Sequence, residues 1–312
     1  MSKPLLIEIG MEEVPARFVR EAAEQLRSKL AEWLKEARIA CGEVRAFATP
    51  RRIAALALDV AERQADYSEE IKGPARKIAV DENGNWTKAA LGFARSQGVK
   101  ESDLFFREVS GAEYVFARKS GAGKDTAALL PQGLADIVLS MAFPKNMRWG
   151  DRDVRFVRPI RWITALLGED VVPLEIAGVK SDRISKGHRF LGRDAVIGTA
   201  AEYAERLKEQ FVIADIGERE AMIRKQIDEL AAANGWKIAV NEDLLEEVLF
   251  LVEYPTVLYG TFDAAFLDIP QDVLITSMRE HQRYFPVLDE NGRLMPYFVT
   301  VRNGDSRSLE LV

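Results

Sequence analysis

A basic segment that also contains several aromatic residues offers the side chains of this sequence best suited to binding a ligand. Residues 145–193 contain 11 Lys and Arg against 6 Asp and Glu, a net charge of +5 in a chain whose formal net charge is −6. Trp149, Phe156, Trp162 and Phe190 lie among these cations. Because cations bind phosphates and aromatic rings stack on bases, the composition favours contact with a nucleic acid. The alternative is an ion-paired surface whose aromatic residues belong to the core.

Arginines and lysines of this segment are expected to contact phosphate, while Trp149 and His188 are expected to stack or to form hydrogen bonds. His188 lies between Gly187 and Arg189, and a loop imidazole beside cations is more often a binding group than a general base. Two further basic clusters, near residues 51 and 281, have a similar character. The predicted contacts are Arg51, Arg52, Lys145, Arg148, Trp149, Arg158, Arg161, Arg183, Lys186, His188, Arg189, His281 and Arg283.

No catalytic or metal site is predicted from the other motifs. The segment 121–126 lacks the glycine and the Ser/Thr that a phosphate-binding loop needs beside its Gly-Lys pair. The acidic pair Glu12-Glu13 could act as an acid/base couple, but carboxylates near a helix N-terminus are favoured by the helix dipole alone. Cys41 has no His near it in the sequence, and the two His of the chain are too far apart to suggest a zinc site.

Composition places the chain among cytoplasmic proteins. Its 312 residues are enough for two domains. A single cysteine excludes a disulfide within the chain and fits a reducing compartment. No apolar run approaches the roughly 18 residues needed to span a bilayer, so no membrane contact is expected.

The pattern of apolar residues predicts an α+β fold with two or more layered domains and mainly antiparallel sheets. A composition shift near Gly150 suggests two domains, residues 1–150 and 151–312, with separate cores and no sheet running through both. Residues 66–74 are charged and turn-rich, as in a linker. Strands are expected at 5–9, 44–48, 53–60, 105–109, 114–119, 161–167, 171–176, 211–214, 256–259, 287–288 and 297–301, and helices at 15–42, 87–97, 125–140, 200–210, 217–234, 242–252 and 272–279.

Nine segments, taken together and in order along the chain, resemble the β subunit of the bacterial heterotetrameric glycyl-tRNA synthetase. They are Leu6-Ile7-Glu8-Ile9-Gly10-Met11-Glu12-Glu13-Val14-Pro15, Thr49-Pro50-Arg51-Arg52, Lys72-Gly73-Pro74, Pro144-Lys145-Asn146-Met147-Arg148-Trp149, Phe156-Val157-Arg158-Pro159, Ser181-Asp182-Arg183, Gly187-His188-Arg189-Phe190, Leu245-Glu246-Glu247-Val248 and Tyr284-Phe285-Pro286. The family's chain is about twice as long. We therefore expect its C-terminal HD-type and anticodon-binding domains to be absent from this sequence.

The resemblance implies that this chain is one part of a glycine–tRNA ligase of composition α2β2. In that family the α subunit uses ATP and Mg²⁺ to activate glycine, and the β subunit supplies recognition of tRNA(Gly). The chain alone is then non-catalytic and holds no cofactor. The resemblance also implies that residues after Gly150 are similar to the B3/B4 module of the phenylalanyl enzyme.

Two other functions stay open. One is a B3/B4-like editing or deacylase module, although glycine is so small that steric exclusion already rejects larger amino acids. The other is a structural scaffold for the assembly that makes no contact with RNA.

Overall fold

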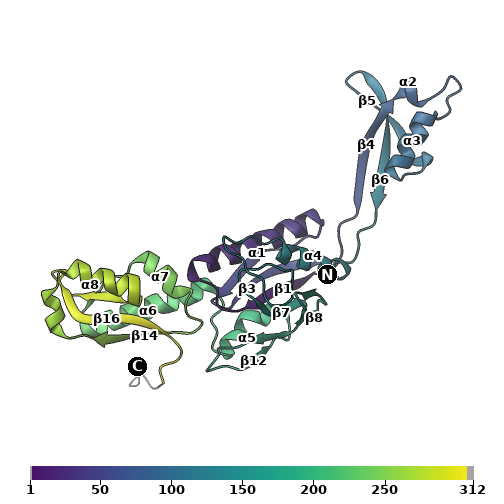
Figure 1. Cartoon of the computed structure of the whole chain (residues 1–312). Helices are drawn as coiled ribbons and strands as arrows, with labels where there is room; N and C mark the ends of the chain where they lie inside the picture. The colour runs from purple at the N-terminus through teal and green to yellow at the C-terminus, as the bar shows by residue number, and fades with distance from the viewer. Residues whose placement is uncertain (1, 308–312) are drawn as a thin grey trace.

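A central sheet connects two further units, an arm and a C-terminal unit, which extend from it in different directions (Figure 1). The computed structural model describes residues 2–307. Met1 and residues 308–312, the outer ends of the two expected domains, lie outside the described residues.

The central sheet has the strand order β2-β3-β1-β7-β10-β9, and β8 pairs with the C-terminal end of β7. Its pairings are antiparallel except that between β10 and β7. The α+β class with mainly antiparallel sheets is thus confirmed. The strands are β1 (Ser2–Met11), β2 (Val44–Thr49), β3 (Arg52–Ala61), β7 (Ile160–Leu167), β8 (Asp170–Val171), β9 (Glu175–Ile176) and β10 (Val179–Asp182).

The expected division at Gly150 is contradicted by the pairing of β1 with β7. This pairing runs from Leu5 opposite Leu167 to Met11 opposite Ile160, so one sheet contains strands from both sides of Gly150. The physical reason lies in β1, whose side chains from Leu5 to Ile9 are fully buried on both faces of the sheet. Such a strand needs a paired neighbour on each side. The composition shift near Gly150 therefore marks a change of surface charge rather than a boundary between cores.

Helices cover both faces of this sheet. One face packs against α1 (Ala16–Glu36) and α4 (Thr126–Leu139), and α1 begins directly after Pro15, as predicted. The other face packs against the 3₁₀ turn η2 (Ala200–Glu202) and α5 (Tyr203–Glu209). A small hairpin of β11 (Ile184–Lys186) and β12 (Asp194–Val196) lies beside this second face.

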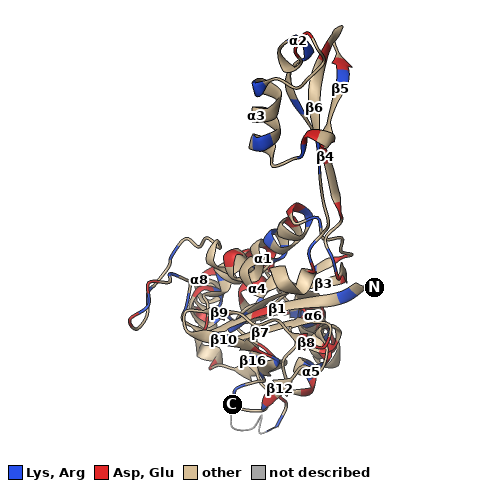
Figure 2. Cartoon of the chain, turned by 90° about the vertical axis from the view of Figure 1, so that its right-hand side faces the viewer, with Lys and Arg blue, Asp and Glu red and all other residues tan. Residues whose placement is uncertain are grey.

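The arm is a three-stranded sheet with two helices, and Figure 2 shows that it stands clear of the rest of the chain. It contains β4 (Tyr67–Ala75), α2 (Arg76–Ala79), α3 (Lys88–Gln97), the 3₁₀ turn η1 (Glu101–Asp103), β5 (Leu104–Val109) and β6 (Ala112–Gly121). The strands predicted at 105–109 and 114–119 are confirmed, and they pair as the hairpin of β5 and β6. The predicted linker at residues 66–74 is wrong, because β4 pairs with β6 from Tyr67 to Ala75.

The C-terminal unit is a four-stranded sheet of order β13-β15-β16-β14 with helices packed on it. Its elements are α6 (Ile216–Asn234), β13 (Lys237–Ile238), α7 (Glu242–Leu249), β14 (Pro255–Thr261), the 3₁₀ turn η3 (Ala264–Asp268), α8 (Gln271–Ser277), the π-helical turn η4 (Met278–Gln282), β15 (Phe285–Leu288) and β16 (Leu294–Asn303). Its buried residues, such as Val248 and Phe285, belong to the same apolar cluster as those of β1 and α1. In the described part of the chain, no helix combines the length and the apolar composition needed to cross a bilayer.

Candidate nucleic-acid interface and the buried ion network behind it

Three adjacent strands place an arginine, a glycine and a tryptophan side by side. Arg52 on β3 and Trp162 on β7 both pair with Gly10 on β1. A Cβ atom at Gly10 would lie 1.9 Å from the Trp162 ring, so only glycine leaves room for the indole to cross β1. The ring therefore lies 5.4 Å from the Arg52 guanidinium, and its N–H donates a hydrogen bond to Glu8.

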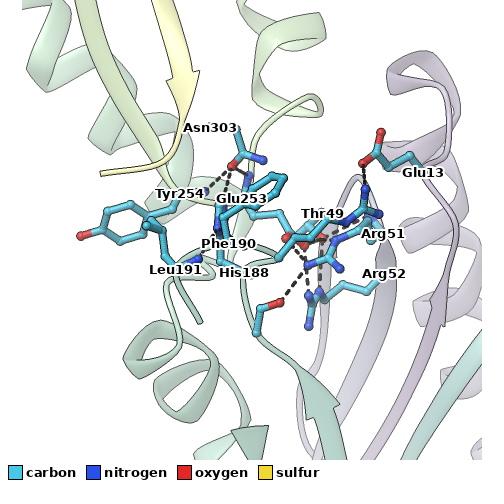
Figure 3. Close-up of polar contacts among 12 residues, drawn as sticks. Glu13, Thr49, Arg51, Arg52, His188, Phe190, Leu191, Glu253, Tyr254 and Asn303 are labelled. Carbon is cyan, nitrogen blue, oxygen red and sulfur yellow. Dashed lines mark hydrogen bonds and ion pairs between the residues drawn. The ribbon is translucent and has the colours of Figure 1, made fainter. Parts of the chain in front are cut away.

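Arg52 is fully buried and is the centre of an ion network drawn in Figure 3. Its Nη2 donates to Glu253 Oε1 at 3.0 Å, and its Nη1 donates to Ser185 Oγ at 3.0 Å. Its Nε donates to Thr49 Oγ1 at 3.2 Å. The carboxylate of Glu8, also fully buried, lies 3.9 Å from Nη1. A buried guanidinium is tolerated only when its charge is paired and its donors are satisfied, and this set of partners meets both conditions.

Glu253 connects this network to the C-terminal unit. Its second carboxylate oxygen accepts a hydrogen bond from Arg51 Nε at 3.2 Å, and Arg51 also donates to the carbonyl oxygen of Gly187 at 2.9 Å. The Thr49 hydroxyl donates to Glu253 at 2.8 Å. Burial alone would raise the pKa of Glu253, but the charges of Arg52 and Arg51 outweigh burial and hold the pKa below its ordinary value. Glu253 is therefore ionised at neutral pH.

His188 fixes the loop that follows Gly187. Its side chain is buried, and Nδ1 accepts hydrogen bonds from the backbone N–H groups of Phe190 and Leu191, both at 3.3 Å. Nε2 lies 3.1 Å from Asn303 Oδ1, which also accepts from the backbone N–H of Glu253 at 2.9 Å. This arrangement assigns the ring proton to Nε2. The imidazole thus ties the loop to the end of β16 and to the ion network (Figure 3).

The prediction that Arg52 and His188 contact tRNA directly gains no support, because both side chains are buried. Arg51 is also largely enclosed, with 11 % of its side chain exposed and its donors engaged by Glu253 and Gly187. These residues join the turn between β2 and β3, the loop at 187–193 and the C-terminal unit.

Three other predicted arginines meet around the acidic pair Glu12-Glu13. Arg161 pairs with Glu12 at 2.6 Å, and Arg189 pairs with Glu13 at 3.6 Å. Arg158 donates from Nε to the backbone carbonyl of Glu13 at 2.9 Å. Phe190, next to Arg189, is 84 % exposed. The structure therefore brings together part of the basic segment, beside an exposed aromatic ring.

The remaining predicted contacts are not gathered at this point. Lys145 and Arg148 are exposed, and Arg148 lies 3.9 Å from Asp153. Trp149 is half-buried against the main core, which favours the structural alternative for this ring. Lys186 pairs with Asp194 at 2.7 Å.

Arg183 donates to the backbone carbonyl of Glu169 at 3.0 Å, so it supports the turn between β7 and β8. In the C-terminal unit, His281 is exposed, whereas Arg283 pairs with Glu247 at 2.8 Å. Whether these side chains contact RNA stays a prediction.

Sequence reasoning missed Glu8, Ser185, Glu253 and Asn303. One signal was present, since an acidic residue inside the apolar run of Leu5 to Ile9 predicts a buried cationic partner. The other three residues carry no local signal. Within residues 2–307, no group of three or more His, Cys, Asp or Glu side chains is placed to hold a metal ion.

Comparison with known proteins identifies the family. Residues 5–312 match the family model described as glycyl-tRNA synthetase beta subunit. The chain is 56 % identical to the glycine–tRNA ligase beta subunit of Bacillus subtilis over 313 residues, and 54 % identical to that of Halalkalibacterium halodurans over 311 residues. These alignments cover 100 % and 99 % of this chain but 46 % and 45 % of the relatives. The chain thus spans about half the length of the curated relatives it matches.

The match extends over almost the whole chain, at sequence identities well above those of unrelated proteins. It confirms the resemblance carried by the nine segments. The chain belongs to the family of the glycyl-tRNA synthetase β subunit.

Proposed function

We propose that this chain is the N-terminal part of a glycine–tRNA ligase β subunit and that it supports the binding of tRNA(Gly) for glycylation by a catalytic α subunit. The observation that carries this proposal is the match of residues 5–312 to the β subunit family. The exposed arginines Arg161 and Arg189 near Glu12-Glu13 add support, since clustered cations beside an exposed aromatic ring are suited to a phosphate backbone.

The proposal includes a division of labour within an α2β2 enzyme of the cytoplasm. The α subunit binds ATP and Mg²⁺ and activates glycine. This chain contributes no reacting group, because the buried carboxylates Glu8 and Glu253 are engaged with Ser185 and Arg52 inside the fold. Its role is to hold tRNA(Gly) and the catalytic partner.

A structural scaffold is the second candidate. It is favoured by the pairing of Arg161 with Glu12 and of Arg189 with Glu13, because an ion-paired arginine needs no external partner. Salt dependence separates the two candidates. Binding through phosphates weakens steeply as the salt concentration rises, whereas a scaffold binds no tRNA at any salt concentration.

Reconstitution tests the proposal. The chain is mixed with the α subunit and with tRNA(Gly), and complexes are separated by sedimentation over a series of salt concentrations. We expect a complex of all three components that loses tRNA as salt rises. We also expect no glycine-dependent pyrophosphate exchange by the chain alone. Absence of tRNA at every salt concentration, or clear exchange by the isolated chain, would contradict the proposal.

A further inference from the structure

The sheet of the arm has helices on only one of its faces. The helices α2 and α3 pack on one side through Ala79, Ala90 and Ala94, which contact Leu104 and Val115 of the sheet in a small separate core. Side chains that alternate with this core point to the opposite side of the sheet. We call that opposite side the open face of the arm.

The register of the strands defines the open face. Directly paired residues share a face, and Phe116 pairs with both Lys72 and Phe105. Arg118 pairs with Glu70, and Arg107 pairs with Tyr114 in the same alternation. The cations of the open face are therefore Lys72, Arg107 and Arg118, its rings are Phe105, Tyr114 and Phe116, and its acidic residue is Glu70.

The two arginines lie over the rings. The Arg107 guanidinium is 5.3 Å from the Phe116 ring, and that of Arg118 is 5.0 Å from the Phe105 ring. Glu70 lies between them, at 2.5 Å from Arg107 and 3.3 Å from Arg118. Both arginine side chains are nevertheless more than half exposed, at 51 % and 59 %. They are held in place and still open to solvent.

This geometry suits a phosphate better than an apolar partner. The N–H groups of a guanidinium lie in its own plane. When the guanidinium lies over a ring, these groups stay free to donate in pairs to phosphate oxygens. Because the rings already hold the arginines, binding costs less side-chain entropy. Phe116 is 7 % exposed beneath its arginine, so this ring offers little apolar surface to a protein.

Charge on the two sides of the arm is unequal. The open face carries three cations and one carboxylate. The neighbouring acidic residues Glu69, Glu108 and Glu113 alternate with the open-face residues and belong to the helix side of the sheet. A net positive face on a chain of net charge −6 attracts a polyanion.

We propose that the open face of the arm is an RNA-binding surface on which Arg107, Arg118 and Lys72 contact phosphates of tRNA. The inference rests on the proposed function and assigns to it a surface separate from the arginines around Glu12-Glu13. The arm projects away from the central sheet in both views, so an extended RNA can reach this face while it contacts the rest of the chain (Figures 1 and 2).

The arm supplies its own control. Arg76 also stacks on a phenylalanine, with its guanidinium 4.7 Å from the Phe106 ring. It pairs with Glu113, and 54 % of its side chain is exposed. Phe106 belongs to the helix side of the sheet. Arg76→Gln therefore removes one charge, one contact with a ring and one ion pair of the same kind without touching the open face.

The experiment measures the affinity of the α–β enzyme for tRNA(Gly) over a series of salt concentrations. Relative to the unsubstituted enzyme, Arg107→Gln combined with Arg118→Gln is expected to weaken binding on the order of tenfold at physiological salt. It should also lower the slope of log affinity against log salt by about two units, since two phosphate contacts are lost. Arg76→Gln should leave both quantities unchanged.

Glu70→Gln gives a test that does not depend on losing the arginines. Removing this carboxylate frees Arg107 and Arg118 for phosphate, so tRNA binding should become roughly threefold tighter. A purely structural arginine–glutamate cluster predicts a lower melting temperature for Glu70→Gln and no tighter binding.

Unchanged tRNA affinity in the double variant, or equal losses in the double variant and in Arg76→Gln, would overturn the inference. Loss of the α subunit from the double variant with tRNA affinity retained would also overturn it, because the occupant would then be a protein. If the double variant has a lowered melting temperature, the Glu70→Gln variant decides. Absence of tighter tRNA binding by Glu70→Gln would then overturn the inference. Failure of the unsubstituted enzyme to bind tRNA(Gly) would instead reject the proposed function, and the inference with it.

Discussion

At the scale of single residues, Glu253 is the carboxylate of the buried network that pairs with both Arg51 and Arg52. One of its carboxylate oxygens accepts from Arg52 and Thr49, and the other accepts from Arg51. Arg52 is fully buried, so the loss of this carboxylate would leave a guanidinium in the interior with only Glu8 nearby. Removing one partner of a buried ion pair costs much more than removing both, because the remaining charge is uncompensated.

We therefore expect Glu253→Gln to lower the free energy of unfolding by about 3–5 kcal/mol. Its control is Glu246→Gln, which removes a pair with Arg20 whose side chains are 43 % and 48 % exposed. That change should cost at most about 1 kcal/mol. Urea unfolding of both variants gives the comparison. Equal effects would mean that burial does not strengthen the Glu253 interactions.

Acid should weaken the same interaction. Because Arg52 and Arg51 hold the pKa of Glu253 below its ordinary value of 4.5, its contribution to stability is present above pH 4.5 and is lost as the pH falls through the lower folded-state value. The difference in melting temperature between the unsubstituted chain and Glu253→Gln should thus be constant near neutral pH and shrink in acid. A difference that does not change between about pH 7 and pH 3 would contradict this assignment.

The burial of the predicted site residues could not be derived from the sequence. The sequence places Arg51, Arg52 and His188 between predicted elements, and such connecting segments are normally exposed. The carboxylate that bonds the buried Arg52 belongs to Glu253, which lies 201 residues away in the chain. Sequence patterns report local periodicity, and they carry no information about such a distant partner.

At the scale of secondary structure, the register of β3, β1 and β7 decides how the network forms. Gly10 stands between Arg52 and Trp162, and its missing side chain is the space that the indole ring occupies. The strand pattern of residues 5–9 predicted β1 itself. It could not predict which strand lies on each side, because that choice depends on pairing between distant segments.

Replacing Gly10 with alanine should therefore destabilise the chain by about 1–3 kcal/mol, since the new methyl group would overlap the Trp162 ring. Gly92→Ala is the matched control. Gly92 lies within α3, and no atom approaches the position of its added Cβ. Alanine should stabilise that helix by roughly 0.5–1 kcal/mol. Thermal melting of the two variants should give shifts of opposite sign, and a neutral Gly10→Ala would refute the packing argument.

Helices and strands whose apolar residues follow a clear period were predicted well. Elements that carry polar and apolar residues on both faces were not. The helix that begins after Pro15 is confirmed, although it ends at Glu36 and not at residue 42. The strands at 105–109 and 114–119 are also confirmed. The segment of β4 resembles a linker in sequence because it is charged and turn-rich. The predicted strand at 211–214 is wrong, since this buried segment is a loop whose backbone bonds to neighbouring segments, with Ala214 accepting from Ala48.

At the scale of the whole molecule, the central sheet is not divisible at Gly150. Residues 1–150 alone would leave β1 without β7, and a strand that is buried on both faces would then become an edge. We expect a fragment of residues 1–150 to lack cooperative unfolding.

By contrast, the arm joins the rest of the chain where Tyr67 pairs with Gly121. Replacing residues 68–120 with a short glycine linker should preserve cooperative unfolding of the remainder. Differential scanning calorimetry of the two shortened proteins measures both outcomes. A cooperative transition in the 1–150 fragment would restore the division at Gly150.

The central claim is that this chain presents cations to tRNA(Gly), and charge reversal at two exposed arginines tests it most directly. Arg148 and Arg189 have side chains that are 56 % and 52 % exposed. Lys225 lies on α6, outside the basic segment, and its side chain is 76 % exposed. Reversing its charge therefore provides the control. The measurement is the rate of tRNA(Gly) charging by the α–β enzyme as a function of tRNA concentration, together with the melting temperature of each variant.

We predict that Arg148→Glu and Arg189→Glu each raise the KM for tRNA on the order of tenfold with an unchanged melting temperature, whereas Lys225→Glu leaves both unchanged. Normal charging by both arginine variants would show that the basic segment is not a tRNA contact. A collapse of the melting temperature would instead show that these arginines hold the fold, and either result would contradict the account.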